Sequence, residues 1–146
     1  MPSEKVSILL VDDDEIDIRT MLRAFRKLNL EESVTVARNG RSALMALRGA
    51  GGQSRLRRPC LVLLDLKMPR MGGLQVLEEL RKDPEIRDTI VFVFSTSCAD
   101  SDKRAAFSYN VAAYLVKTQD DEEALDLVSR YLRIAEFPPE IEVAPR

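Results

Sequence analysis

Six polar residues stand at the ends of short apolar runs in this sequence, and their types could together carry out phosphoryl chemistry. They are Asp12, Asp13, Asp14, Asp65, Ser95 and Lys117. Carboxylates held close together repel one another unless a cation lies between them, and a site that offers only oxygen ligands favours a hard ion such as Mg²⁺. An aspartate beside such an ion can act as a nucleophile toward phosphorus. A lysine and a hydroxyl can then stabilise the charge on the transferring phosphoryl group.

The other reactive residue types are few. Histidine is absent, which excludes Ser-His-Asp and Cys-His catalysis and any site with imidazole ligands. The two cysteines do not form the pattern of a disulfide framework or a metal cluster. Cys60 precedes a continuous apolar run and is predicted to lie in the core, whereas Cys98 is predicted to lie in a polar loop.

Length and composition indicate a globular protein. The chain has 146 residues, which is room for one domain, and 45% of them are hydrophobic and 32% charged. The formal net charge is -2, and neither half of the chain is basic enough to indicate binding to nucleic acid. No apolar run is long enough to span a membrane, and the N-terminal residues lack a signal-peptide pattern. We therefore expect a cytoplasmic protein that binds neither nucleic acid nor membranes.

The elements that must position the polar residues alternate along the chain. Apolar runs predict strands at 6–11, 34–37, 60–65, 90–94 and 113–116. Helical patterns follow them at 16–28, 42–48, 74–82, 101–109 and about 120–135. Five βα units in sequence predict a parallel sheet with helices on both faces. Because ligands bind at the carboxyl ends of such strands, the polar residues are predicted to meet at one edge of the sheet.

Single aspartates near a helix start have an ordinary structural interpretation. Asp14 and Asp17 are predicted to be helix N-caps or turn formers, not ligands. Asn110 is predicted to adopt a left-handed conformation after its helix. Residues 49–58, rich in glycine and arginine, are predicted to form an exposed loop.

Four segments resemble the motifs of bacterial response-regulator receiver domains. They are Leu10-Val-Asp-Asp-Asp14, Leu63-Leu-Asp-Leu-Lys-Met-Pro69 with Gly72-Gly73, Phe94-Ser95, and Tyr114-Leu-Val-Lys117. The resemblance covers roughly residues 5–135, and the separations of 30 residues from Asp65 to Ser95 and 22 from Ser95 to Lys117 fit it. It implies a flavodoxin-like three-layer fold with the strand order 2-1-3-4-5. Residues 1–135 would form the receiver domain and 136–146 a C-terminal extension.

The resemblance also implies the roles of the acidic residues. Asp65 would accept a phosphoryl group. Asp13 would bind Mg²⁺ (or Mn²⁺) directly, and Asp12 would bind it largely through water. The backbone carbonyl of Lys67 would supply another ligand.

Three further residues correspond to the switch of the family. Ser95 matches the switch Ser/Thr, Lys117 the phosphate-binding lysine, and Tyr114 the aromatic residue that swings inward on phosphorylation. Thr118 stands where the family usually has a proline after a cis peptide bond. A cis bond without proline costs about 3 kcal/mol, so we expect either a trans bond or a strained loop after Lys117.

Partners follow from the same resemblance. The chain would receive its phosphoryl group from a sensor histidine kinase or a phosphotransfer protein. It would catalyse only its own phosphorylation and dephosphorylation and would act on no other substrate. The Thr after the lysine, the Ser-Thr-Ser stretch and the tail are similar to single-domain regulators that pair with bacterial phytochrome kinases. The apolar residues of the last helix and of segment 136–146 predict a homodimer in which the segment serves as a dimerisation arm.

Three other functions can be compared with the residues at these positions. A hydrolase that forms an aspartyl phosphate would carry a second aspartate at position 67, where this chain has Lys67. A flavin-binding electron carrier would need a phosphate-cradling loop after the first strand, where three aspartates would repel a phosphate. A degenerate receiver that acts only as a docking module, independent of phosphorylation, stays open as the main alternative.

Overall fold

The computed structural model of the chain describes residues 6–49, 55–57, 60–117 and 121–134. These residues form a parallel sheet of five strands in the order β2-β1-β3-β4-β5. The flavodoxin-like order predicted from the sequence is therefore confirmed. The elements, in chain order, are β1 (Ser7–Val11), α1 (Glu15–Lys27), the short helix η1 (Glu31–Ser33), β2 (Val34–Ala37), α2 (Gly40–Arg48), β3 (Cys60–Leu64), α3 (Gly73–Lys82), β4 (Ile90–Ser95), α4 (Asp100–Ser108), β5 (Ala113–Val116) and α5 (Asp121–Ile134).

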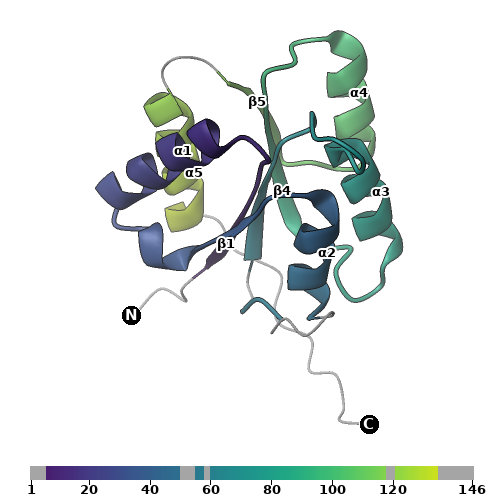
Figure 1. The fold of residues 1–146 in the computed structure, drawn as a ribbon, viewed down its shortest axis with the longest axis horizontal. Coiled ribbons are helices and arrows are strands. Elements are labelled where there is room, and N and C mark those ends of the chain that lie inside the picture. The colour runs from purple at the N-terminus through teal and green to yellow at the C-terminus, as the bar shows by residue number, and fades with distance from the viewer. Residues whose placement is uncertain (1–5, 50–54, 58–59, 118–120, 135–146) are drawn as a thin grey trace, which may run out of the picture.

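The sheet lies between two helical layers (Figure 1). Leu9 of β1 belongs to a core shared with α2 and α3, and its neighbour Leu10 belongs to a second core shared with α1 and α5. Strand β3 is buried along its whole length, because it is a central strand covered on both faces. Cys60, its first residue, is buried as predicted, and Cys98 is exposed.

Local capping groups fix where the helices begin and end. The side chain of Asp14 caps α1 as predicted, accepting from the amides of Ile16 at 2.9 Å and Asp17 at 3.2 Å. Helix α2 begins two residues earlier than predicted, because Asn39 caps it by accepting from the Ser42 amide at 2.8 Å. Asn110 has φ 58° after α4, the left-handed conformation that the sequence predicted.

Several predictions fall outside the described residues. They concern the tail 136–146, the bond between Lys117 and Thr118, and most of the loop 49–58. In that loop, Gly49 ends α2 with φ 73°, and residues 55–57 are described. None of the helices within the described ranges is both long and apolar enough to cross a membrane.

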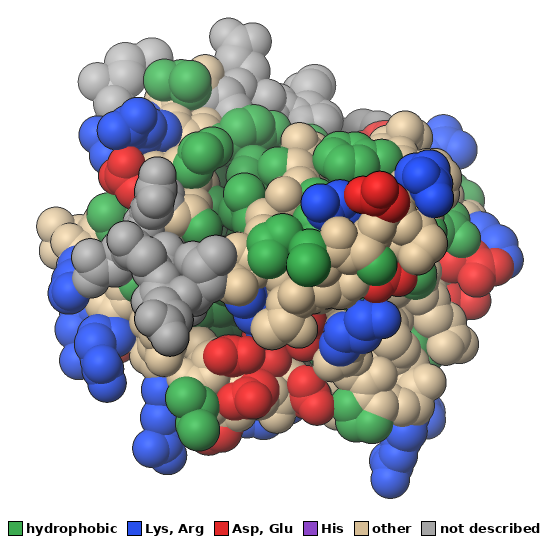
Figure 2. Space-filling model, turned by 90° about the horizontal axis from the view of Figure 1, so that it is seen from above, with side chains coloured by type: hydrophobic (Ala, Val, Ile, Leu, Met, Phe, Trp, Pro, Cys, Tyr) green, Lys and Arg blue, Asp and Glu red, His purple; other side chains and the backbone are tan. Residues whose placement is uncertain are grey.

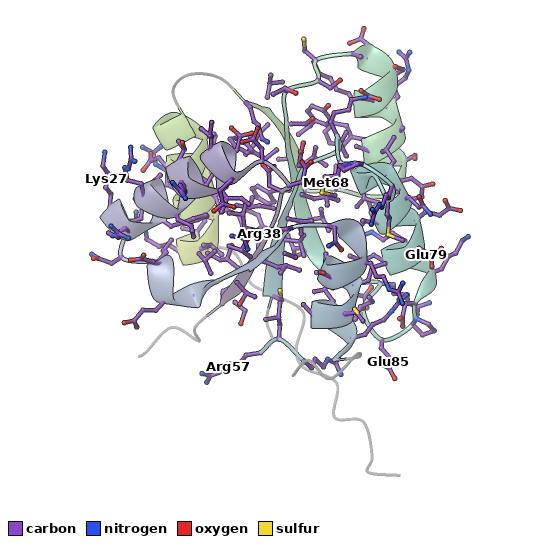
Figure 3. The ribbon with its side chains drawn as sticks, in the orientation of Figure 1. Lys27, Arg38, Arg57, Met68, Glu79 and Glu85 are labelled. Carbon is purple, nitrogen blue, oxygen red and sulfur yellow. The ribbon has the colours of Figure 1, made fainter. Side chains whose placement is uncertain are left out.

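The two ends of the sheet carry different groups. Met68 lies in the loop after β3, near the carboxyl edge, whereas Arg57 and Glu85 lie toward the opposite end of the molecule (Figure 3). Seen from above the carboxyl edge, acidic side chains gather in one place (Figure 2). The predicted site residues lie at this edge.

Candidate functional site

Asp12 and Asp65 lie side by side because the strands that precede them are neighbours. Val11 of β1 is in register with Leu64 of β3, and the Asp65 amide donates to the Val11 carbonyl at 2.9 Å. Both aspartates are buried, with 1% of Asp12 and 6% of Asp65 exposed. Asp13 is exposed, and one carboxylate oxygen of each of the three residues lies within 4.8 Å of the others. The structure thus brings together the three aspartates that the sequence predicted as metal ligands.

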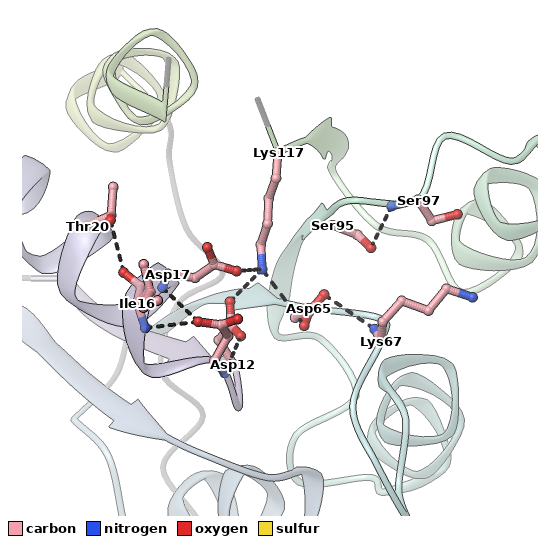
Figure 4. Close-up of polar contacts among 10 residues, drawn as sticks. Asp12, Ile16, Asp17, Thr20, Asp65, Lys67, Ser95, Ser97 and Lys117 are labelled. Atoms are coloured by element: carbon pink, nitrogen blue, oxygen red, sulfur yellow. Dashed lines mark hydrogen bonds and ion pairs between the residues drawn. The ribbon is translucent and has the colours of Figure 1, made fainter. Parts of the chain in front are cut away.

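Lys117 follows β5 at the same edge, and its ammonium group lies beside the carboxylates of Asp12 and Asp65 (Figure 4). Its Nζ is 2.6 Å from Asp12 Oδ2, 2.9 Å from Asp17 Oδ2 and 3.8 Å from Asp65 Oδ2. The lysine side chain is only 7% exposed. Burial opposes its charged form, but hydrogen bonds to Asp12 and Asp17 and the nearby charge of Asp65 outweigh this and raise the pKa of Lys117. The lysine is therefore a fixed positive charge of the site.

Asp65 is held in an environment that disfavours its ionised form. Burial raises the pKa of Asp65 from 3.8 to about 6, and the negative charges of Asp12 and Asp13 act in the same direction. The charge of Lys117 and a hydrogen bond from the Lys67 amide to Asp65 Oδ1, at 3.3 Å, oppose this rise without cancelling it. Lys117 alone therefore does not offset the burial of Asp65.

The cluster fits a hard divalent cation. Its side-chain donors are all carboxylate oxygens, which Mg²⁺ and Mn²⁺ prefer, and two of the three carboxylates are buried. Buried carboxylates are stable in the ionised form only when a positive charge compensates them. Asp12, Asp13 and Asp65 are the residues that would hold the ion. The Lys67 carbonyl stays a predicted ligand.

Ser95 and Tyr114 lie on the strands at the other side of Asp65. Ser95 is the last residue of β4 and is fully buried, and its Oγ accepts from the Ser97 amide at 3.3 Å. Tyr114 is partly buried in β5, and its hydroxyl donates to the Ser97 carbonyl at 2.8 Å. The two predicted switch residues therefore contact the same loop residue. The inward movement of Tyr114 stays a prediction.

Sequence reasoning missed the part that the Lys67 side chain plays. Its Nζ is 3.2 Å from Asp102 Oδ2, and the same oxygen accepts from Ser97 Oγ at 2.5 Å. These hydrogen bonds, from Ser97 and from Lys67, lower the pKa of Asp102. The network joins the loop after β3 to the first turn of α4.

Asp17 takes a larger part in the site than the sequence predicts. The sequence predicted an N-cap or turn former, but Asp14 is the N-cap, and the Asp17 carboxylate bonds to Lys117 at 2.9 Å. The available signal was its spacing: in a helix capped by Asp14, Asp17 lies in the first turn, beside the acidic end of β1.

The end of β2 adds no group to the cluster, since Arg38 pairs with Glu15 at 3.2 Å.

Gly73 lets α3 approach the backbone that carries Asp65. A Cβ at this position would lie 2.4 Å from the Asp65 carbonyl oxygen and 2.7 Å from Leu66 Cα. Backbone atoms cannot turn aside as a flexible side chain can, so a side chain here would displace the loop. The motif glycine of the sequence thus has a steric reason.

The response regulator receiver domain family model matches residues 8–129 of the chain. The probable methanogenesis regulatory protein FilR2 of Methanothrix harundinacea is 37% identical over 112 residues, covering 75% of this chain and 70% of FilR2. Response regulator Rcp1 of Synechocystis is 30% identical over 121 residues, covering 83% of this chain and 82% of Rcp1.

Two solved structures of response regulators are similar in fold to this chain. The Mn²⁺-bound form of Rcp1 has a TM-score of 0.76, and the phosphorylated cyanobacterial phytochrome response regulator RcpA one of 0.80. Each is 30% identical, with 92% of this chain and 99% of the other covered. With its motifs, its strand order and its clustered aspartates, the chain belongs to the family of response regulator receiver domains.

Proposed function

We propose that this receiver domain is a phosphorylation switch in which Asp65 accepts a phosphoryl group from a phosphohistidine of a sensor kinase or a phosphotransfer protein. The placement of Asp65 carries the proposal. Its carboxylate lies at the carboxyl edge of the sheet, with oxygens of Asp12 and Asp13 within 4.8 Å and the Lys117 ammonium at 3.8 Å. An aspartate that has both a cation site and an ammonium group beside it is the arrangement that phosphoryl transfer to a carboxylate needs.

The residues of the site can each take a defined part in the transfer. A carboxylate oxygen of Asp65 forms the new bond to phosphorus as the P–N bond of phosphohistidine breaks, and the departing nitrogen takes up a proton. A bound Mg²⁺ or Mn²⁺ would supply positive charge to the phosphoryl oxygens. Lys117 offsets further charge, and the hydroxyl of Ser95 offers a hydrogen bond. Hydrolysis of the same aspartyl phosphate by water would return the domain to its first state.

Phosphorylation would then act as a switch by changing contacts at this edge. The phosphoryl group adds charge-assisted contacts to Ser95 and Lys117, which favour one of two conformations. Tyr114 is the residue through which we expect the change to reach β5 and the loop after β4, because its hydroxyl already bonds to Ser97.

Metal removal tests the proposed function. Incubation with acetyl phosphate and Mg²⁺ is expected to add the mass of one phosphoryl group to the intact chain, measured by mass spectrometry. Excess EDTA should slow the addition by at least about 100-fold, because a metal ion contributes several kcal/mol to such a transfer. Fresh Mg²⁺ in excess should restore it. A chain that gains no mass under either condition would be a docking module instead.

The partner surface of the switch is proposed to include α5. Leu127 is 54% exposed and Ile134 is 82% exposed, and their seven-residue spacing places them on one side of the helix. We propose a homodimer that uses this side of α5 and residues 136–146. RcpA is a phytochrome response regulator, which supports a phytochrome-type sensor kinase as the donor.

Light scattering tests the dimer. The full chain is expected at twice the mass of its monomer, and a chain that ends at residue 135 is expected to be largely monomeric, since it lacks the proposed arm. Leu127→Asp should also lower the dimer fraction, because it places a charge in the apolar interface. Monomeric mass for the full chain at all concentrations would exclude this assembly.

A further inference from the structure

Asp12 is a predicted metal ligand whose two oxygens are already bonded. Its Oδ1 accepts from the Asp14 amide at 2.9 Å, and its Oδ2 accepts from Lys117 Nζ at 2.6 Å. A cation that approaches Asp12 is therefore opposed by an ammonium group bonded to the same carboxylate. For Asp12 to turn to the cation, the ammonium needs another acceptor.

Among the residues that the structure describes, two carboxylates other than Asp12 lie near that ammonium. Asp65 Oδ2 is 3.8 Å away, beyond hydrogen-bond distance, and Asp65 is itself a predicted ligand of the ion. Asp17 Oδ2 is at 2.9 Å, within hydrogen-bond distance, and stands outside the group of three aspartates that could hold an ion.

The position of Asp17 is fixed by the start of α1. Its amide donates to Asp14 Oδ1 at 3.2 Å, which holds the first turn of the helix in place. From this turn its carboxylate reaches toward Lys117 (Figure 4). Its side chain is 34% exposed, so it can carry a charge at a smaller desolvation cost than the buried Asp12.

We propose that Asp17 is a positioning residue that keeps the Lys117 ammonium in the site when Asp12 turns to a divalent cation. Asp17 itself does not bind the ion. It offers the ammonium a second acceptor. Lys117 can then stay in the site when the cation binds, and Asp12 need not bond to the ammonium and the cation at once. The inference rests on the proposed function only in taking the three aspartates as a divalent-cation site.

Calorimetric titration of the unphosphorylated full chain with Mg²⁺ tests this role. Asp17→Asn is expected to weaken Mg²⁺ binding about five- to tenfold relative to Asp14→Asn, the size usual for groups that interact directly. Asp14→Asn is the matched control, because it removes one negative charge from the same helix end while asparagine still caps α1. Asp17→Glu should restore most of the affinity.

A double-mutant cycle shows whether Asp17 acts through Lys117. In the Lys117→Met background, Asp17→Asn is expected to have no effect on Mg²⁺ affinity, because no ammonium needs a second acceptor. An undiminished effect in that background would mean that Asp17 acts on the ion directly and would overturn the proposal. If Lys117→Met does not fold, equal affinities of Asp17→Asn and Asp14→Asn, or no rescue by Asp17→Glu, would overturn it as well.

The two proposals fail in different ways. In one outcome, the wild type takes up a phosphoryl group while Asp17→Asn and Asp14→Asn bind Mg²⁺ with equal affinity. That result would leave the proposed function intact and remove the role of Asp17. If Asp17→Asn weakens Mg²⁺ binding but the wild type takes up no phosphoryl group, the role of Asp17 would stand and the proposed function would fail.

Discussion

Asp65→Asn is expected to reduce phosphoryl uptake from acetyl phosphate by at least about a thousandfold, which is the scale of losing a nucleophile. An amide has no carboxylate oxygen with which to form the aspartyl phosphate. The substitution keeps the size of the side chain, and its amide oxygen can still accept from the Lys67 backbone at the place of the 3.3 Å bond. The loss should therefore reflect chemistry and not misfolding. Intact mass after incubation with Mg²⁺ measures it directly.

Asp14→Asn is the matched control for this loss. Asp14 lies two residues after Asp12 but faces the first turn of α1, where it bonds to the amides of Ile16 and Asp17. Its variant should take up one phosphoryl group at close to the wild-type rate. A phosphoryl mass on Asp65→Asn equal to that on Asp14→Asn would place the acceptor at another residue.

The second large effect concerns stability and pH in the absence of divalent ions. The ordinary pKa of an aspartate is 3.8, but the pKa of Asp65 is raised to about 6 in the folded chain, because the carboxyl is buried beside other acids. Between these two pH values the folded state binds more protons than the unfolded state, so the free energy of unfolding falls as pH rises. The contribution is favourable and complete below about pH 4 and is lost above about pH 6. The loss amounts to about 3 kcal/mol.

Urea unfolding in EDTA at several pH values measures this contribution. Asp65→Asn cannot ionise at this position, so its free energy of unfolding should equal that of wild type at pH 4 and exceed it by about 2 to 3 kcal/mol at pH 7.5. Asp14→Asn should follow wild type to within about 1 kcal/mol over the same range. Excess Mg²⁺ should stabilise wild type more than Asp65→Asn, because it binds the ionised carboxylate in the folded state. Parallel curves for wild type and Asp65→Asn would contradict the raised pKa.

The strands, the helix positions to within two residues and the edge at which the polar residues meet could all be predicted from the sequence. These features depend on local signals: apolar runs of strand length, an aspartate or asparagine before a helix, and the rule that parallel strands end at one edge. Asp12, Asp65 and Lys117 could be placed together for this reason. The strand order came from the motifs, since composition and periodicity leave the order of parallel strands open.

How the side chains share their charges could be seen only in the folded chain. Lys117 contacts Asp17, 100 residues away, and the network of Lys67 with Asp102 joins the loop after β3 to helix α4. Such pairs depend on side-chain reach across elements that are distant in sequence, which no local pattern encodes. The same holds for the pKa of Asp65, because it depends on burial by several elements at once. It also holds for Gly73, whose missing side chain is explained only by a carbonyl oxygen that the fold brings against it.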